Sequence, residues 1–233
     1  MLTINFHLLK IDPGDRVLDA GCGLGRHTLY TSKMPCQLWA TDLLGHDLLR
    51  VQGILSLMEE QKQKVGQVQL LRSDLLQLPF ADGTFDKIIC SEVLEHLHDD
   101  EQGLKELVRV LKKGGSLAIS VPTFFSEFIN GMLSDEYFNC PGGHVRKYNA
   151  HKLAASIVSK NLTIYDVRFE HSLHTIYWSL RCLFGLSNEK SFIPRTYKNF
   201  LDWTIITRNF KKFDRVFNFI FPKSIVFYAH KKG

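Results

Sequence analysis

The sequence predicts an α/β fold in which a mostly parallel sheet carries helices on both faces. Apolar segments typical of strands alternate with helical segments from residue 16 to about residue 168, which is the pattern of a doubly wound sheet. A glycine-rich turn follows the first of these strands, and an acidic residue stands at the end of each of the next two. Ligands of such folds bind at the carboxyl ends of the strands, so these features predict a ligand site there.

The first strand is expected over residues 16–19, and it leads into the turn GCGLG at residues 21–25. Glycine lets the backbone bend tightly and approach a ligand, while the N–H groups that open the following helix would face the same ligand. The spacing differs from the dinucleotide fingerprint, because the last glycine comes one residue early and Arg26 takes its place. The carboxylate of Asp19 would repel a pyrophosphate and attract an ammonium group. A nucleoside that bears an amino-acid tail therefore fits this turn better than a dinucleotide.

The next strands end in polar residues at matching positions. A second strand over 37–40 ends at Asp42, about 20 residues beyond the glycines, where an acidic side chain accepts hydrogen bonds from ribose hydroxyls. A long helix over 43–63 separates it from a third strand over 68–72, which Ser73, Asp74 and Leu75 follow. The remaining elements predicted for this half are a strand over 85–90 that runs into Ser91, a helix over 101–113 stopped by Gly114 and Gly115, and a strand over 116–121.

The sequence of the C-terminal half predicts one more helix and two more strands. Asn149 is a plausible N-cap for the helix, and strands are expected over 162–169 and 223–229. The segment 170–222 between those strands shows two helical series of apolar residues. One runs from Leu173 to residue 184. The other runs from Trp203 to Ile220, and its opposite face carries the cations Arg208, Lys211, Lys212 and Arg215.

The D-x-G-x-G-x-G turn at 19–25 and the ordered strand ends resemble the class I S-adenosylmethionine-dependent methyltransferases, over residues 16–122. Within that family the chain is most similar to the small-molecule branch that includes ubiquinone- and menaquinone-pathway enzymes. The resemblance implies a Rossmann-like sheet of seven strands in the order 3-2-1-4-5-7-6, with strand 7 antiparallel. It also implies one domain over 1–233 in which 170–222 forms a helical, lid-like insertion.

The resemblance further implies that S-adenosylmethionine is the cofactor and S-adenosylhomocysteine the product. The residues at the family's cofactor positions are Asp19, Gly21, Cys22, Gly23, Asp42, Leu43, Ser73, Asp74, Leu75 and Ser91. In the family the acidic residue after the third strand, here Asp74, receives the adenine amino group.

Candidate catalytic residues follow the fourth and fifth strands. His96 lies after the fourth, while His144 and Arg146 lie in a G-H-x-R-x-Y segment that resembles the loop over the acceptor in quinone- and lipid-type methyltransferases. His144 would take a proton from the acceptor while Arg146 holds an acidic or enolate oxygen. The alternative is that both residues brace the loop, with Tyr148 packed beneath them.

Three side chains of types that bind metal ions lie close together in the sequence, at Glu92, Glu95 and His96. If this segment were helical, they would share one face and could bind magnesium or zinc, as the E-x-x-E-H pattern of ubiquinone-pathway O-methyltransferases suggests. The same residues also cap or line the site in metal-free members, so we expect no metal here.

Charge and composition indicate the cellular location that we expect for the protein. Five scattered cysteines without a C-x-x-C pair indicate a reducing, cytoplasmic location, and no apolar uncharged run reaches the ~18 residues of a membrane span. Residues 190–233 carry ten Lys and Arg against two Asp, a local charge of +8, whereas the rest of the chain carries −3. The basic, aromatic segment 199–221 is therefore expected either to pack as a lid or to contact a membrane surface peripherally.

The expected acceptor is a small apolar or amphipathic molecule, methylated at oxygen or carbon. Nucleic acid is an unlikely partner, because Ser91-Glu92-Val93 stands where base-modifying enzymes have [DN]-P-P-[YF]. An RNA methyltransferase and a non-catalytic S-adenosylmethionine-binding protein remain the alternatives. The sequence leaves the acceptor's identity and the oligomeric state open.

Overall fold

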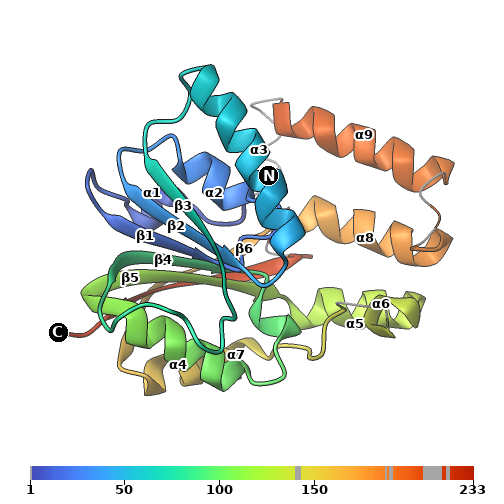
Figure 1. Cartoon of the computed structure of the whole chain (residues 1–233). Helices are drawn as coiled ribbons and strands as arrows, with labels where there is room; N and C mark the ends of the chain where they lie inside the picture. Colours follow the sequence, from blue (N-terminus) through green and yellow to red (C-terminus); the bar gives the residue numbers. More distant parts are fainter. Residues whose placement is uncertain (1, 140–142, 187, 189–190, 207–216, 219–220) are drawn as a thin grey trace.

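A computed structural model describes residues 2–139, 143–186, 188, 191–206, 217–218 and 221–233. At its centre lies a seven-stranded sheet with the order β3-β2-β1-β4-β5-β7-β6 (Figure 1). The strands are β1 Arg16–Ala20, β2 Gln37–Asp42, β3 Gln67–Arg72, β4 Phe85–Ser91, β5 Leu111–Pro122, β6 Leu162–Glu170 and β7 Ser224–Lys231. The first five run parallel, whereas β7 is antiparallel to both β5 and β6. The predicted order and the antiparallel last strand are confirmed.

Helices cover both faces of this sheet (Figure 1). Helix α1 Phe6–Leu9 precedes β1. Between the strands lie α2 Arg26–Thr31, α3 Gly45–Glu60, the 3₁₀ turn η1 Leu94–His96, α4 Asp100–Val110, α5 Phe124–Leu133, α6 Glu136–Asn139, α7 Ala150–Ser159, α8 Ser172–Phe184 and α9 Phe192–Ile206. In Figure 1, α2 and α3 lie on one face and α4 and α7 on the other. The order in which the chain adds strands to the sheet reverses between β1 and β4, so the turn that follows β1 lies at the middle of the sheet. Folds of this kind bind ligands at that position.

The core follows the two-residue period of the strands. Ile88 and Ile89 of β4 are both fully buried, but Ile88 joins the large apolar cluster and Ile89 joins another with Ile4 and Val226. Strands that are apolar on both faces are typical of a parallel sheet covered on both sides. The carboxyl ends of β1, β2 and β4 are therefore held rigidly, and they carry the candidate site.

One helix boundary predicted from the sequence is wrong. Helix α4 ends at Val110, and the next residues already belong to β5, where Leu111 pairs with Phe85. Gly114, with φ +76°, falls at an irregularity inside the strand and does not stop the helix. The ion pair between Lys112 and Asp86, 2.6 Å long, holds this early part of β5 against β4. Tertiary pairing overrides the local helical pattern over 111–113.

The insertion between β6 and β7 contains two helices in the described residues. The first apolar series is confirmed as α8, and α9 begins at Phe192, well before the second series. Most of that second series, including its four cations, lies outside the described residues. Helix α8 packs against both α9 and α5 (Figure 1). Among the described helices, none is long and apolar enough to cross a membrane.

Candidate active site

The turn after β1 has three glycines, of which Gly21 and Gly25 are crowded by neighbouring side chains and Gly23 is open. A Cβ atom at Gly21 would lie 2.5 Å from Cγ2 of Val93, so this residue lets the turn pack against the segment after β4. At Gly23, where φ is +50°, no atom lies within 4 Å of a Cβ position. Open space beside a backbone of this shape is what a bound ligand requires. The turn therefore offers a surface at Gly23 and is anchored at Gly21.

Asp19 lies beneath this turn. Its side chain is 2% exposed, and Oδ2 accepts a hydrogen bond of 2.6 Å from the hydroxyl of Thr28 in α2. Burial raises the pKa of Asp19 to about 6, although Thr28 and Arg26 act in the opposite direction. The carboxyl group joins β1 to α2 and places a titratable charge under the predicted cofactor.

Asp42 ends β2 beside the turn. Its Oδ2 accepts a hydrogen bond of 2.7 Å from the Gly23 N–H, and its Oδ1 accepts one of 2.9 Å from the Leu44 N–H. A carboxylate oxygen has two lone pairs, so each still has one acceptor position for a ribose hydroxyl. The next side chain, Leu43, is 57% exposed and offers an apolar surface for an aromatic base.

The remaining cofactor candidates lie around this centre. The Ser73 N–H donates to the Asp42 carbonyl oxygen over 3.1 Å, which joins the ends of β2 and β3. Asp74 is exposed, and its Oδ1 accepts from the Leu76 N–H over 2.9 Å. Leu75 and Cys22 are buried, and burial raises the pKa of the Cys22 thiol. These two residues therefore pack behind the site.

The end of β4 carries a small polar network. The hydroxyls of Ser91 and Ser120 lie 2.8 Å apart, and Ser120 donates to the Glu92 carboxylate over 2.9 Å. Lys223, which immediately precedes β7, lies 3.2 Å from the same carboxylate. Burial alone would raise the pKa of Glu92, but Lys223 and Ser120 hold it below its usual range. Glu92 is thus an ionised member of a structural ion pair.

Glu127 holds His144 in a defined orientation. This glutamate of α5 is 1% exposed, and its Oε2 lies 2.7 Å from His144 Nδ1. Its other oxygen accepts a hydrogen bond of 2.8 Å from the hydroxyl of Tyr137. A carboxylate that has lost its proton can only accept, so this contact suits an imidazole that donates from Nδ1 and keeps Nε2 as its acceptor nitrogen. The arrangement is a carboxylate–imidazole pair of the kind that moves protons in enzymes.

His96 and Glu95 stand beside this pair. The rings of His96 and His144 are 4.8 Å apart, and His96 Nδ1 lies 3.3 Å from the Gly143 carbonyl oxygen. Glu95 is fully buried, and neither carboxylate oxygen has a hydrogen-bond partner among the described residues. Burial, together with the nearby Glu92 charge, raises the pKa of Glu95 well above its usual value. This environment favours the neutral form of the Glu95 carboxyl group.

The three residues considered as metal ligands from the sequence, Glu92, Glu95 and His96, do not share one face of a helix. Residues 94–96 form a 3₁₀ turn, and Glu92 has a left-handed φ of +59° and pairs with Lys223. Among the described residues, the group that could hold a metal ion is Glu95, His96 and His144, with one ligand atom of each within 4.8 Å of the others. A carboxylate with two imidazoles suits a divalent transition metal, and Glu127 would support His144 from behind.

Arg146 is engaged in holding the loop. Its guanidinium forms an ion pair with Asp100 and donates to the carbonyl oxygens of Leu97 and His98 over 2.6 and 2.7 Å. The Tyr148 hydroxyl donates to the same Asp100 over 2.6 Å. This geometry favours the bracing role for Arg146 over contact with an acceptor oxygen.

Glu127 and Tyr137 were not anticipated from the sequence. The signal for their helix was present, because Thr123 follows β5 and its hydroxyl caps the Ser126 N–H over 3.3 Å. A single acidic residue in the apolar run 124–133 marks Glu127 as a buried charge that needs a partner. That His144 is the partner depends on tertiary structure.

Comparison with known proteins agrees with this geometry. Residues 18–119 match the protein family described as Methyltransferase domain. The methyltransferase GfsG of Streptomyces halstedii is 30% identical over 118 residues, which are 49% of this chain and 40% of the relative. A demethylmenaquinone methyltransferase of Corynebacterium glutamicum is 34% identical over 112 residues, 48% of this chain and 44% of the relative. The matches thus span less than half of each relative's length.

A solved structure extends the comparison to the whole fold. The crystal structure of a putative methyltransferase from Bacillus halodurans superposes with a TM-score of 0.68 at 17% identity, covering 98% of this chain and 97% of that one. At this identity the likeness concerns the fold alone, and it includes the part of the chain beyond residue 119. The family match over residues 18–119, together with the glycine turn and the strand order, places this part of the chain among the class I S-adenosylmethionine-dependent methyltransferases.

Proposed function

We propose that this chain transfers a methyl group from S-adenosylmethionine to a small apolar or amphipathic molecule, at an oxygen or carbon atom. The observation that carries the proposal is the placement of a proton-accepting pair beside the cofactor turn. Val93 packs on Gly21, and η1 follows directly, where the ring of His96 contacts that of His144. The named activities of the relatives, among them demethylmenaquinone methylation, support a small-molecule acceptor.

The cofactor residues fit a nucleoside with an amino-acid tail. Gly23 leaves room for the ligand, Asp42 has acceptor positions for the ribose hydroxyls, and Leu43 offers an apolar surface to the base. Asp19 supplies a charge attractive to the ammonium group of the tail. When bound, the cofactor supplies an activated methyl group on a sulfonium.

The acceptor side requires alignment and removal of a proton. Holding the two reactants in line can lower a barrier by ~7–11 kcal/mol. We assign the proton to Nε2 of His144, because Nδ1 is occupied by Glu127, whose charge stabilises the imidazolium that forms. The methyl–acceptor bond forms as the methyl–sulfur bond breaks, and the acceptor's proton ends on His144. Arg146 and Tyr148 keep the loop in place through Asp100.

The test has a binding part and a transfer part. Calorimetry should show binding of S-adenosylmethionine, and Asp42→Ala should weaken it by ~1–3 kcal/mol, the cost of lost buried hydrogen bonds. Glu60→Ala at the exposed end of α3 is the matched control and should bind normally. Preference for a nicotinamide dinucleotide would refute the proposal.

For transfer, the protein is incubated with methyl-labelled S-adenosylmethionine and fractionated cell extract. Mass spectrometry should find a labelled small molecule together with S-adenosylhomocysteine. Label on RNA would instead favour the RNA methyltransferase. Cofactor binding without label on any fraction would favour the non-catalytic alternative.

A further inference from the structure

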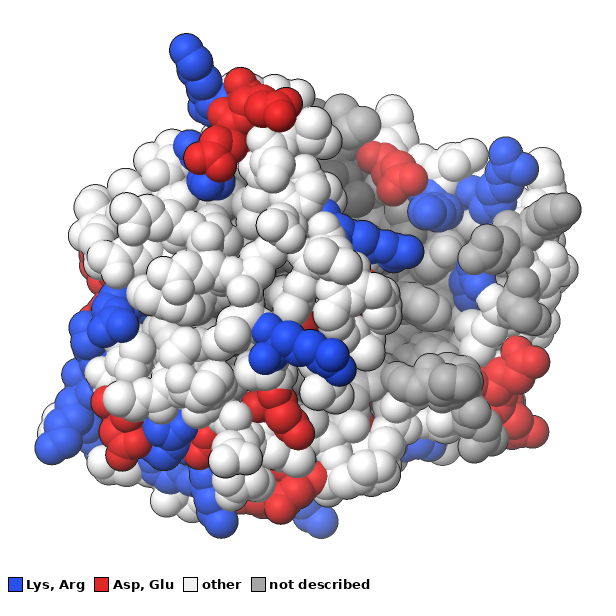
Figure 2. Space-filling view, in the orientation of Figure 1, with Lys and Arg blue, Asp and Glu red and all other residues white. Residues whose placement is uncertain are grey.

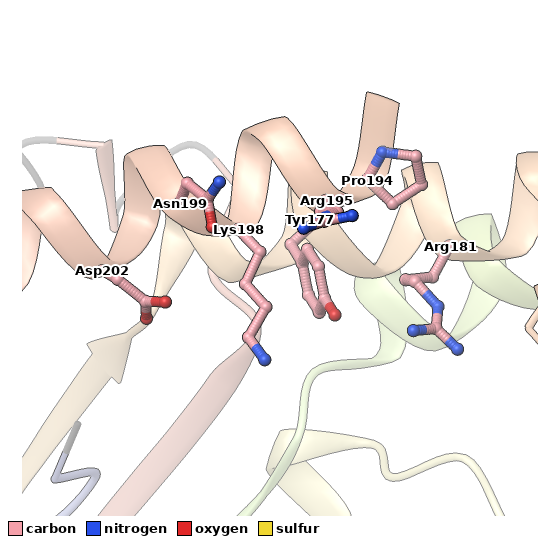
Figure 3. A pocket seen from close by; sticks show the side chains of 7 residues that line it. All are labelled: Tyr177, Arg181, Pro194, Arg195, Lys198, Asn199 and Asp202. Atoms are coloured by element: carbon pink, nitrogen blue, oxygen red, sulfur yellow. The ribbon is translucent and has the colours of Figure 1, made fainter. Parts of the chain in front are cut away.

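A pocket of about 330 Å³ opens between α8 and α9, away from the cofactor residues (Figure 3). Helix α8 contributes Tyr177 and Arg181, which are one turn apart, and α9 contributes Arg195, Lys198 and Asp202 among others. The two helices pack side by side, so these residues line a shared groove. None of the residues that line it belongs to the cofactor or His144 sites.

The pocket has a positive balance of charge. It holds three cationic side chains and one carboxylate, and among the described residues no ion pair neutralises Arg181, Arg195 or Lys198. In Figure 3, Asp202 lies at one end of the row and Arg181 at the other, with Lys198 between them. Figure 2 shows Lys and Arg side chains over the part of the surface where Figure 1 places α8 and α9.

The guanidinium group of Arg181 has a hydrogen-bond donor that finds no acceptor among the described residues. One terminal nitrogen donates to the Leu186 carbonyl oxygen, but Nε is buried and has no acceptor among the described residues. A buried donor on a charged group without an acceptor is costly, and an anion in the groove would relieve that cost. Tyr177 and Asn199 add neutral polar groups to the same lining.

We propose that this pocket binds a phosphoryl group. Guanidinium groups match the oxygens of phosphate in a fork geometry, and a lysine adds a mobile point charge. Two arginines with one lysine therefore suit a ligand that carries a phosphate better than a ligand that carries a single carboxylate. The balance of charge disfavours a cationic ligand. The volume accommodates a phosphate and part of the group that carries it.

The surroundings indicate that the phosphoryl group belongs to an amphipathic molecule. On α9 the side chains of Phe192 and Trp203 are 79% and 52% exposed, and on α8 Leu183 is 60% exposed. Exposed aromatic and aliphatic groups next to cations suit a ligand with a phosphate at one end and an apolar body. Such a ligand is either a lipid headgroup in a membrane or a free phosphoryl-bearing amphiphile, and the two share the phosphate chemistry.

The experiment measures phosphate binding without turnover. Calorimetry with inorganic phosphate at low salt compares the wild-type chain with the double variant Arg195→Gln/Lys198→Gln. Affinity should fall about tenfold or more, because hydrogen bonds to charged groups are lost. The control Lys33→Gln/Lys113→Gln removes the same charge from other exposed positions and should bind phosphate like the wild type. Asp202→Asn, which removes the pocket's carboxylate, should tighten binding several-fold.

Flotation with vesicles identifies the source of the phosphate. Binding to vesicles of phosphatidylcholine with phosphatidic acid, lost in the pocket variant and kept in the control, supports a headgroup. Phosphate binding without vesicle binding supports a free amphiphile. The proposal is overturned if the wild-type chain fails to bind phosphate, or if both double variants lose affinity equally. Cofactor binding is measured on the same samples, so failure of the methyltransferase proposal would be seen separately.

Discussion

At the scale of single residues, Asp19 is expected to couple cofactor binding to pH. Burial raises its pKa to about 6, so the carboxyl group is neutral below that value and ionised above it. The folded pKa is higher than the ordinary value of 3.8, so the stabilisation from the neutral form is complete below about pH 4. It is lost as the pH rises through about 6, at a cost of about 3 kcal/mol.

Cofactor affinity should follow the opposite trend. Only ionised Asp19 attracts the ammonium group of S-adenosylmethionine, so affinity should rise as the pH increases through about 6. Calorimetry in two buffers of different ionisation heat should also show proton release on binding near that pH. Asp19→Asn should make affinity nearly independent of pH over this range. A wild-type profile as flat as that of the variant would contradict this role.

Glu127 is expected to act through His144. Its carboxylate contacts His144 Nδ1 at 2.7 Å, and Glu127→Gln keeps the shape but removes the charge. We expect kcat to fall about 10²-fold or more, as when general base catalysis is impaired, with little change in cofactor binding. The loss should appear in kcat and not in the KM of the acceptor, because Glu127 acts on the proton transfer through His144.

Tyr137→Phe provides the matched control for this pair. It removes the hydrogen bond to the other oxygen of Glu127 but leaves the carboxylate on His144. A much smaller loss of kcat is expected. Equal losses of kcat in both variants would assign Glu127 a purely structural role.

The Glu95, His96 and His144 group is expected to work without a metal. Glu95 is fully buried, and burial raises its pKa well above the usual value, so a neutral side chain of the same shape should replace it. Glu95→Gln should therefore keep transfer activity, and a chelator should leave the wild-type rate unchanged. If the chelator abolishes activity and zinc or magnesium restores it, this cluster is a metal site and the expectation is wrong.

At the scale of elements, substitutions at two glycines of the turn between β1 and α2 are expected to affect stability and cofactor binding differently. Gly23→Ala meets no neighbouring atom but places a side chain at φ +50° in the ligand space, so it should cost about 1–2 kcal/mol of stability and most of the cofactor affinity. In Gly21→Ala the added Cβ would lie 2.5 Å from Val93, so stability should fall further. Thermal melts and calorimetry on both variants test this, and the reverse ranking in stability would contradict it.

The elements also show which features local sequence determines. The strands and the residues that end them were predictable, because apolar runs and glycine turns act within a few residues. The early start of β5 at Leu111 was not, because it depends on pairing with Phe85 in another strand. The contact of Glu127 with His144 likewise joins residues 17 positions apart across a loop. The sequence names His144 and His96 as candidates, and it could not supply the carboxylate that orients one of them.

At the scale of the whole molecule, the insertion between β6 and β7 begins and ends at one edge of the sheet. Glu170 pairs with Ser224, and the Lys223 N–H donates to the Glu170 carbonyl oxygen over 3.1 Å. A two-residue turn could therefore replace residues 171–222 without moving either strand. Within the described residues, α8 contacts α5, the helix that carries Glu127, so the insertion adjoins the pair formed by Glu127 and His144.

We predict that the insertion covers the acceptor pocket as a lid. Every cofactor residue proposed above precedes residue 100, so a chain in which an Asn-Gly turn replaces 171–222 should bind S-adenosylmethionine within a few-fold of the full chain. Transfer to the acceptor should collapse, because the apolar wall of its site is lost and water enters. Circular dichroism and cofactor binding establish that the shortened chain is folded before its rate is compared. A folded chain that keeps the full transfer rate would show that residues 171–222 serve some purpose other than covering the acceptor.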